Sequence, residues 1–214
     1  MNNTIKFVAV AAFFGTASVP ASAVTWDFLA NGTGNLGAAQ IFNEGGQTLG
    51  AGVGGSADAL YGKNAGPGET GLGVNNDPSG DHEIYSGSAI ALEAQTPGVD
   101  FVSVLLGSVQ PNESWFVAES ADGIHFQPVI GDASALGGGN ANGELTVNID
   151  PGNNWIVVSV GCTDNSACFG GTTDAANNIL IESATTTNVP EPATLSLLGL
   201  GLAAIGLRRK RTTN

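Results

Sequence analysis

Positive charge is almost absent from the middle of this 214-residue chain. Of six lysines and arginines, only Lys63 lies between residues 24 and 188, whereas all of the 19 acids except Glu191 lie there. No cluster of basic residues exists in this segment that could neutralise phosphates, which excludes nucleic acid as a partner. A surface with 18 carboxylates and one cation suits neutral glycans or divalent cations, and it also serves solubility outside a cell.

The side chains and motifs of common catalytic sites are equally scarce. The chain has two histidines, His82 and His125, and Ser86 stands where a His-Glu-x-x-His zinc motif needs its second histidine. It has no Gly-x-Ser-x-Gly elbow, and its glycine-rich stretches lack the Gly-Lys-Ser/Thr ending of a phosphate loop. A carboxylate pair for glycoside hydrolysis stays open, but nothing selects one. We therefore expect a non-enzymatic protein.

Helical periodicity is also missing between residues 24 and 188. Short segments rich in β-branched and aromatic residues alternate instead with turn signals such as Asp150-Pro151-Gly152. Strands are predicted at 24–28, 88–92, 101–106, 115–119, 124–130, 145–149, 155–160 and 179–181. The glycine-rich stretch 31–73 predicts short strands with long turns. Together they favour an all-β fold, an antiparallel β-sandwich of the jelly-roll kind.

Three tryptophans are expected on these strands. Trp26, Trp115 and Trp155 are predicted to lie in the core, because large aromatic residues on sandwich strands usually do. For Trp115 and Trp155, a platform on which sugar rings stack remains the alternative.

One acidic segment is a candidate calcium site. Asp77, Asp81 and Glu83 place three carboxylates within seven residues and with no cation nearby in the sequence, which suits Ca²⁺. An EF-hand loop is rejected because Asn75 would be its first ligand and Ser86 its twelfth. The alternative is a solvated acidic turn.

The N-terminus has the pattern of a secretory signal peptide. Lys6 is followed by an apolar stretch at 7–19 and by Ala21-Ser22-Ala23, a small-x-small cleavage site. Residues 1–23 are therefore predicted to be a signal peptide that leads the chain into the Sec export machinery, and Val24 is the predicted mature N-terminus. Residues 24–188 then form one exported domain, the ectodomain, which is long enough to bury a core.

Export also bears on the two cysteines, Cys162 and Cys168. Because exported proteins meet oxidising conditions, we expect a local disulfide between them. Metal binding is disfavoured because no second cysteine pair exists, and a catalytic thiol is disfavoured because neither cysteine has a Cys-His signature.

The C-terminus carries three features in a fixed order. Pro190, Glu191 and Pro192 form a stiff extended segment, and an almost uncharged run follows at 193–207. As a helix this run would be about 22 Å long, a short transmembrane helix for a hydrocarbon core of about 30 Å. A basic anchor then follows and is expected to stay in the cytoplasm, so that the preceding chain faces outward; its residues are Arg208, Arg209, Lys210 and Arg211.

This order resembles the PEP-CTERM sorting signal of Gram-negative bacterial surface proteins, over residues 189–211. The resemblance implies recognition by an exosortase, which removes the tail, and a transient anchor in the inner membrane. It further implies a non-enzymatic cell-surface or extracellular-matrix protein associated with exopolysaccharide and biofilm. An ordinary tail anchor would need no Pro-Glu-Pro. A carbohydrate- or Ca²⁺-binding adhesin and a secreted hydrolase remain the alternatives for the ectodomain.

A second resemblance concerns the segment 114–129. Its aromatic strand leads through Ser120-Ala121-Asp122-Gly123 into a strand with Phe126, which is similar to a hairpin of galactose-binding-like jelly rolls. This resemblance supports the sandwich fold and implies little about function.

Overall fold

The computed structural model describes residues 22–28, 32–55, 57–109, 115–130, 143–160 and 178–188. All of them belong to one compact unit, Ala21–Val189. The predicted signal peptide, residues 1–23, lies outside the described residues up to residue 21, as do both cysteines and the sorting signal from 189 onward. Within the described ranges, no helix is long and apolar enough to cross a membrane.

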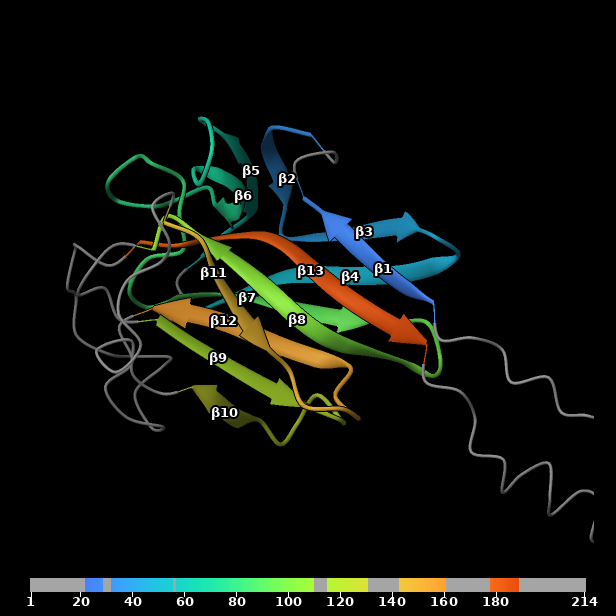
Figure 1. The fold of residues 1–214 in the computed structure, drawn as a ribbon. Helices are drawn as coiled ribbons and strands as arrows, with labels where there is room; N and C mark the ends of the chain where they lie inside the picture. The colour runs from blue at the N-terminus through green and yellow to red at the C-terminus, as the bar shows by residue number, and fades with distance from the viewer. Residues whose placement is uncertain are drawn as a thin grey trace, which may run out of the picture. The chain divides into compact units, whose positions relative to one another are not determined.

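The described strands form two antiparallel sheets (Figure 1). In the first sheet, β1 (Ala23–Asp27) pairs with β13, and the other strands follow the order β11 (Leu145–Asn148), β8 (Val99–Gly107), β13 (Leu180–Asn188), β6 (Thr70–Val74), β5 (Leu60–Asn64) and β2 (Gly34–Gly37). In the second sheet the order is β10 (Gln127–Ile130), β9 (Trp115–Ser120), β12 (Trp155–Val160), β7 (Ser88–Ala94), β4 (Gln47–Gly55) and β3 (Ala39–Glu44). The predicted all-β sandwich is confirmed.

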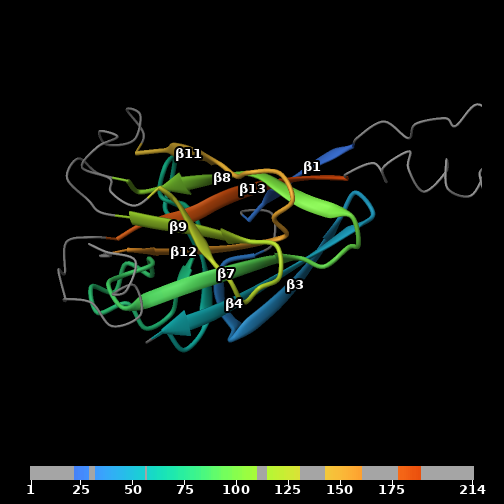
Figure 2. The ribbon, with the colours of Figure 1, turned by 90° about the horizontal axis from the view of Figure 1, so that it is seen from below.

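The core lies between the two sheets and follows from the period-2 pattern of the strands. Trp26 of β1, Phe101 of β8, Leu92 of β7 and Trp115 of β9 are each at most 1% exposed. Figure 2 shows β8 and β13 in one layer and β7 and β4 in the other. Strand β12 is buried on both faces from Ile156 to Val160, whereas Trp155 at its start is half-buried.

The glycine-rich stretch differs from its prediction. Strands β2 to β6 fill most of it, and β4 alone spans nine residues, so long turns are not its main feature. Glycine is needed here for close approach: a Cβ on Gly71 would overlap the carbonyl oxygen of Ile181, and one on Gly73 would overlap that of His82. Packing between backbones, which the composition does not reveal, offsets the entropy that ordering these glycines costs.

Two other strand boundaries are corrected. Strand β10 begins at Gln127 rather than at residue 124, because residues 121–125 form a turn that brings His125 to the surface instead of into a strand. Strand β13 continues to Asn188, well beyond the predicted 179–181, since its polar half pairs with β1 and β8.

A buried hydrogen-bonded chain joins the two sheets beside β1. Nε1 of Trp26 donates to Oγ1 of Thr186 at 2.9 Å, and that hydroxyl donates to Oε1 of Gln47 at 2.5 Å. Trp26 and Thr186 belong to the first sheet, whereas Gln47 opens β4 of the second. The first and last strands of the ectodomain are therefore tied to the opposite sheet.

Candidate functional site

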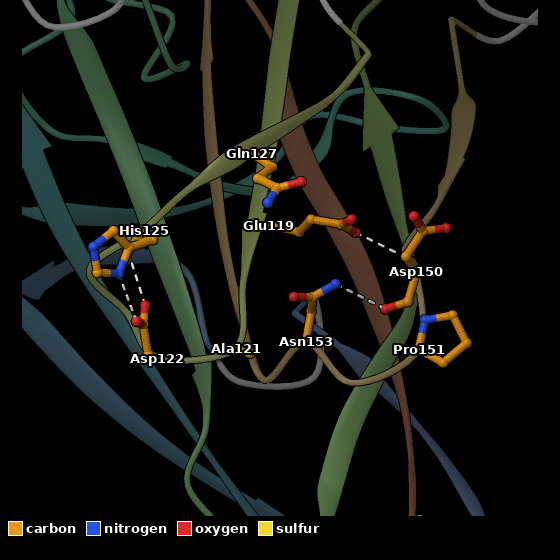
Figure 3. A pocket seen from close by; sticks show the side chains of 8 residues that line it. All are labelled: Glu119, Ala121, Asp122, His125, Gln127, Asp150, Pro151 and Asn153. Atoms are coloured by element: carbon orange, nitrogen blue, oxygen red, sulfur yellow. Dashed lines mark hydrogen bonds and ion pairs between the residues drawn. The ribbon is translucent and has the colours of Figure 1, made fainter.

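A pocket of about 420 Å³ lies where the β9–β10 turn meets the connection between β11 and β12 (Figure 3). Strands β9 and β10 supply Glu119 and Gln127, and the turn between them supplies Asp122 and His125. The remaining lining residues are Ala121, Asp150, Pro151 and Asn153. Carboxylates, amides and one imidazole thus border the pocket, and its eight described lining residues include no Trp, Tyr or Phe.

The β9–β10 turn is built by its own side chains. Oγ of Ser120 accepts the N–H groups of Asp122 at 3.2 Å and of Gly123 at 3.0 Å. Oδ1 of Asp122 accepts the N–H groups of Ile124 at 2.9 Å and of His125 at 2.8 Å. These side-chain-to-backbone hydrogen bonds explain the Ser-x-Asp-Gly pattern, because they fix the conformation of the turn beside the pocket.

The same contacts determine the charge of Asp122. Hydrogen bonds from the backbone and side chain of His125, and from the N–H of Ile124, hold the pKa of Asp122 well below its ordinary value. Nδ1 of the exposed His125 lies 2.7 Å from Oδ2 of Asp122 (Figure 3). Asp122 is therefore a turn-stabilising anion rather than a group poised to exchange a proton near neutral pH.

Glu119 is the buried acid of the pocket, with 8% of its surface exposed. Its Oε2 accepts the N–H of Asp150 at 2.8 Å, while Nδ2 of Asn153 donates to the carbonyl of Asp150 at 3.0 Å (Figure 3). Burial raises the pKa of Glu119 above its ordinary value, although the N–H of Asp150 opposes this; the nearby Asp150 carboxylate raises it further. Glu119 thus secures the β11–β12 connection to β9.

The three predicted calcium ligands are not gathered around one point. The carboxylate of Asp77 accepts the N–H and the hydroxyl of Ser79, at 3.0 and 2.6 Å, and the N–H of Glu83 at 3.2 Å. Asp81 is exposed. In the described part of the chain, no group of three or more metal-binding side chains converges. Asp77 thus stabilises its own turn, so the structure does not support the proposed ligand set.

The expectation of no cation near Glu83 is wrong. Nζ of Lys63 donates to Oε1 of Glu83 at 2.5 Å and to Oε2 of Glu69 at 2.7 Å. Burial raises the pKa of Glu83 to about 7, although Lys63 opposes this. Burial also disfavours the charge of Glu69, but its hydrogen bond from Lys63 keeps its pKa below the ordinary value. The ectodomain's one cation therefore serves a partly buried structural cluster on β5.

The tryptophans divide between the two roles considered from the sequence. Trp26 and Trp115 are core residues, each 1% exposed. Trp155 is half-buried and borders a second hollow, of about 220 Å³, on the outer face of the second sheet. The prediction that all three lie in the core is wrong for Trp155.

Comparison with known proteins identifies the tail. Residues 188–211 match the PEP-CTERM protein-sorting motif. The predicted sorting signal is confirmed, and with it the assignment of the chain as an exported protein with a C-terminal membrane-anchoring signal. No curated protein matches the chain in sequence.

Solved structures similar to this chain include a family 29 carbohydrate-binding module, CBM29-2, complexed with mannohexaose. It is 12% identical, with 80% of this chain and 94% of that chain covered and a TM-score of 0.33. Another structure of a family 29 module is 11% identical, with 80% of this chain and 91% of that chain covered and a TM-score of 0.33. CpGH89CBM32-5 from Clostridium perfringens, in complex with GalNAc-β-1,3-galactose, is 12% identical, with coverage of 65% and 94% and a TM-score of 0.30.

The sequence singled out only part of the lining of the larger pocket, the turn with Ala121 and Asp122. Ser120, Asp122 and Gly123 were marked by their motif, but Glu119 and Asp150 are 31 positions apart and come together only where β9 meets the β11–β12 connection. With 18 acids in the ectodomain, no local signal distinguishes this pair.

Proposed function

We propose that this protein is an exported, non-enzymatic cell-surface or extracellular-matrix protein that an exosortase sorts through its C-terminal tail. The observation that carries the proposal is the sorting motif at 188–211, which begins where β13 ends at Asn188. The folded ectodomain would thus be held by its tail in the inner membrane after Sec export, and removal of the tail would release it to the surface or the medium.

The environment of the pocket acids supports a non-enzymatic role. Glu119 accepts a backbone N–H of the β11–β12 connection, and Asp122 accepts two N–H groups of its own turn. Two of the three pocket acids, Glu119 and Asp122, therefore have structural partners, whereas a general acid or base must be free to reach a substrate. The sorted protein would act in an envelope rich in exopolysaccharide, where an acidic surface stays soluble among neutral polymers.

A second candidate function is that of a carbohydrate-binding adhesin. The half-buried Trp155 beside an open hollow favours it, because sugar sites combine an aromatic face with a few polar side chains. Ca²⁺ is a further ligand that we propose for such an adhesin, and titration of the protein with Ca²⁺ would reveal binding through a rise in melting temperature.

Mass spectrometry of the protein recovered from membranes and medium of the producing cells tests the sorting proposal. We expect the mature chain to begin at Val24, to end near Pro190 and to lack Arg208. A variant with alanine at Pro190, Glu191 and Pro192 should keep its basic end and accumulate in the membrane.

A variant with alanine at Thr212 and Thr213, beyond the motif, is the matched control and should be processed normally. Recovery of the wild-type protein with its C-terminal tail intact, from every fraction, would show a permanent anchor and contradict the proposal.

A further inference from the structure

The second hollow lies across four neighbouring strands of the second sheet. Ile41 of β3 pairs with Gly50 of β4, Gly50 with Glu93 of β7, and Glu93 with Trp155 of β12. These residues form one row across the sheet, over three strand spacings of about 4.8 Å, or about 14 Å. Leu92 and Ile156, the neighbours of this row in β7 and β12, point into the core, so the row faces outward.

The floor of this groove is made of residues with little or no side chain. Gly50 and Gly52 of β4 and Ala91 of β7 line it, while Ile41 at one end is 52% exposed and Trp155 stands at the other. The side chain of Gln95 lies over Gly50, where a Cβ would be 2.6 Å from its Nε2, whereas a Cβ on Gly52 would meet no side chain within 4 Å. A ligand can therefore lie close to the backbone of the sheet at Gly52 and beside Ala91. The hollow is therefore an open groove rather than a closed cavity.

Trp155 is held in place at its end of the groove. A Cβ on Gly123 would lie 2.9 Å from Cε2 of the indole, so the β9–β10 turn packs directly on the ring. Gly123 has a φ of +70°, a conformation that the Ser120 and Asp122 hydrogen bonds produce. The ring is consequently a rigid aromatic surface that loses little entropy when a ligand stacks on it.

A polar pair lies next to Trp155 and over Gly50 of the floor. Nε2 of Gln95 donates to Oε2 of Glu93 at 2.8 Å, and both side chains line the groove. An amide and a carboxylate offer donors and acceptors to hydroxyl groups. One aromatic face, a flat floor and a few directed polar groups together match the two sides of a sugar ring, whose C–H face is apolar and whose rim carries hydroxyls.

Charge narrows the ligand class further. Glu93 lies in the groove, and the lone cation of the ectodomain, Lys63, is paired with two carboxylates on the first sheet. An acidic sugar would meet repulsion without any compensating cation. We propose that the groove between Ile41 and Trp155 binds an extended chain of neutral sugars. This proposal rests on the second candidate function, the carbohydrate-binding adhesin, for which it names the ligand class, and it does not depend on the tail.

Binding of cellohexaose, a neutral extended oligosaccharide, to the full chain tests the proposal by titration calorimetry, with an acidic hexagalacturonate for comparison. The chain is kept in a polyoxyethylene detergent, which carries no sugar headgroup. We expect cellohexaose to bind and hexagalacturonate to show no measurable heat. Trp155→Ala should weaken binding about tenfold or more, and Trp155→Tyr should restore part of the affinity.

Two glycine variants on β4 distinguish the effect of filling the groove from the general effect of adding a side chain to the strand. A Cβ on Gly52 would meet only the carbonyl oxygen of Ala38 at 3.9 Å, so Gly52→Val fits the sheet and fills the floor. Gly54 lies two residues further on the same face, where a Cβ would meet only Cβ of Ala89 at 4.0 Å, and it is not among the residues that line the groove. We expect Gly52→Val to abolish binding and Gly54→Val to preserve it, with similar melting temperatures for both.

Four results would overturn the proposal: no heat with cellohexaose at millimolar concentration, tighter binding of hexagalacturonate, unchanged affinity in Trp155→Ala, or equal losses in Gly52→Val and Gly54→Val. Because sorting is read from the C-terminal end of the chain and sugar binding from calorimetry, each proposal can fail alone. If Trp155→Ala does not fold, the two glycine variants still decide the outcome.

Discussion

Removing a single buried hydroxyl, in Thr186→Val, tests how the edge strand β1 is held. The Thr186 hydroxyl accepts from Nε1 of Trp26 and donates to Oε1 of Gln47, and all three residues are at most 3% exposed. Valine keeps the shape but leaves the indole N–H and the amide oxygen without these partners. Each such buried group costs about 1 to 3 kcal/mol, so the two together should lower the free energy of unfolding by about 2 to 6 kcal/mol.

This loss is large against the total of about 5 to 15 kcal/mol expected for a domain. At about 2 to 4 °C per kcal/mol for a chain of this size, the melting temperature should fall by about 4 to 24 °C. Urea unfolding followed by tryptophan fluorescence gives the same quantity independently, because Trp26 itself is one of the reporters.

Thr185→Val is the matched control one residue away on β13. Its hydroxyl lies 3.4 Å from that of Thr25 on the exposed side, so its loss should change the free energy of unfolding by no more than about 0.5 kcal/mol. If Thr186→Val and Thr185→Val destabilise the protein equally, the buried chain between the sheets does not hold β1, and the reasoning is refuted.

Three further outcomes are expected. Burial, aided by the charges of Glu144, Asp27 and Glu69, raises the pKa of Glu182, at the β13 bulge, to about 7. The folded state therefore holds a proton that the unfolded state releases near pH 4.5, so the stability of the protein should fall as pH rises from about 4.5 to 7. Thermal melts of Glu182→Gln over this pH range should show a smaller fall in melting temperature than those of the wild type. The pKa of Asp122 is lowered, so its contribution to stability is complete above its unfolded pKa of 3.8 and decreases as pH falls below that value. Asp122→Asn should therefore lower the melting temperature more at pH 7 than near pH 2, and equal effects at both values would contradict this. The mature protein, denatured without reductant, should show no free thiol, and a thiol count of two would exclude the predicted bond between Cys162 and Cys168.

Parts of this protein could be predicted because their signals are local. The strands at 88–92, 101–106, 115–119, 145–149 and 155–160 all lie within strands of the structure except for residue 149, since two-residue periodicity and turn residues act over a few positions. Strand β13 was cut short because its polar half, from Glu182 to Asn188, becomes a strand only through pairing with β1 and β8.

Long-range neighbours had no such signal. Lys63 and Glu83 are 20 positions apart, and their ion pair, which removes Glu83 from the predicted calcium ligands, follows from the packing of the first sheet. Whether Trp155 faces the core or the groove depends on the register of β12 with β7 and β9, and a shift of one residue would reverse it.

Patterns of neighbouring residues were enough to predict the sorting motif and the alternation that makes a sandwich, and both are confirmed. The signal peptide, a pattern of the same local kind, stays a prediction. The order and register of the strands decided which carboxylates form ion pairs, which tryptophan reaches the outer face of the sheet, and where glycines of β4 line a groove. These features depend on contacts between residues far apart in the chain, which neighbouring residues do not encode.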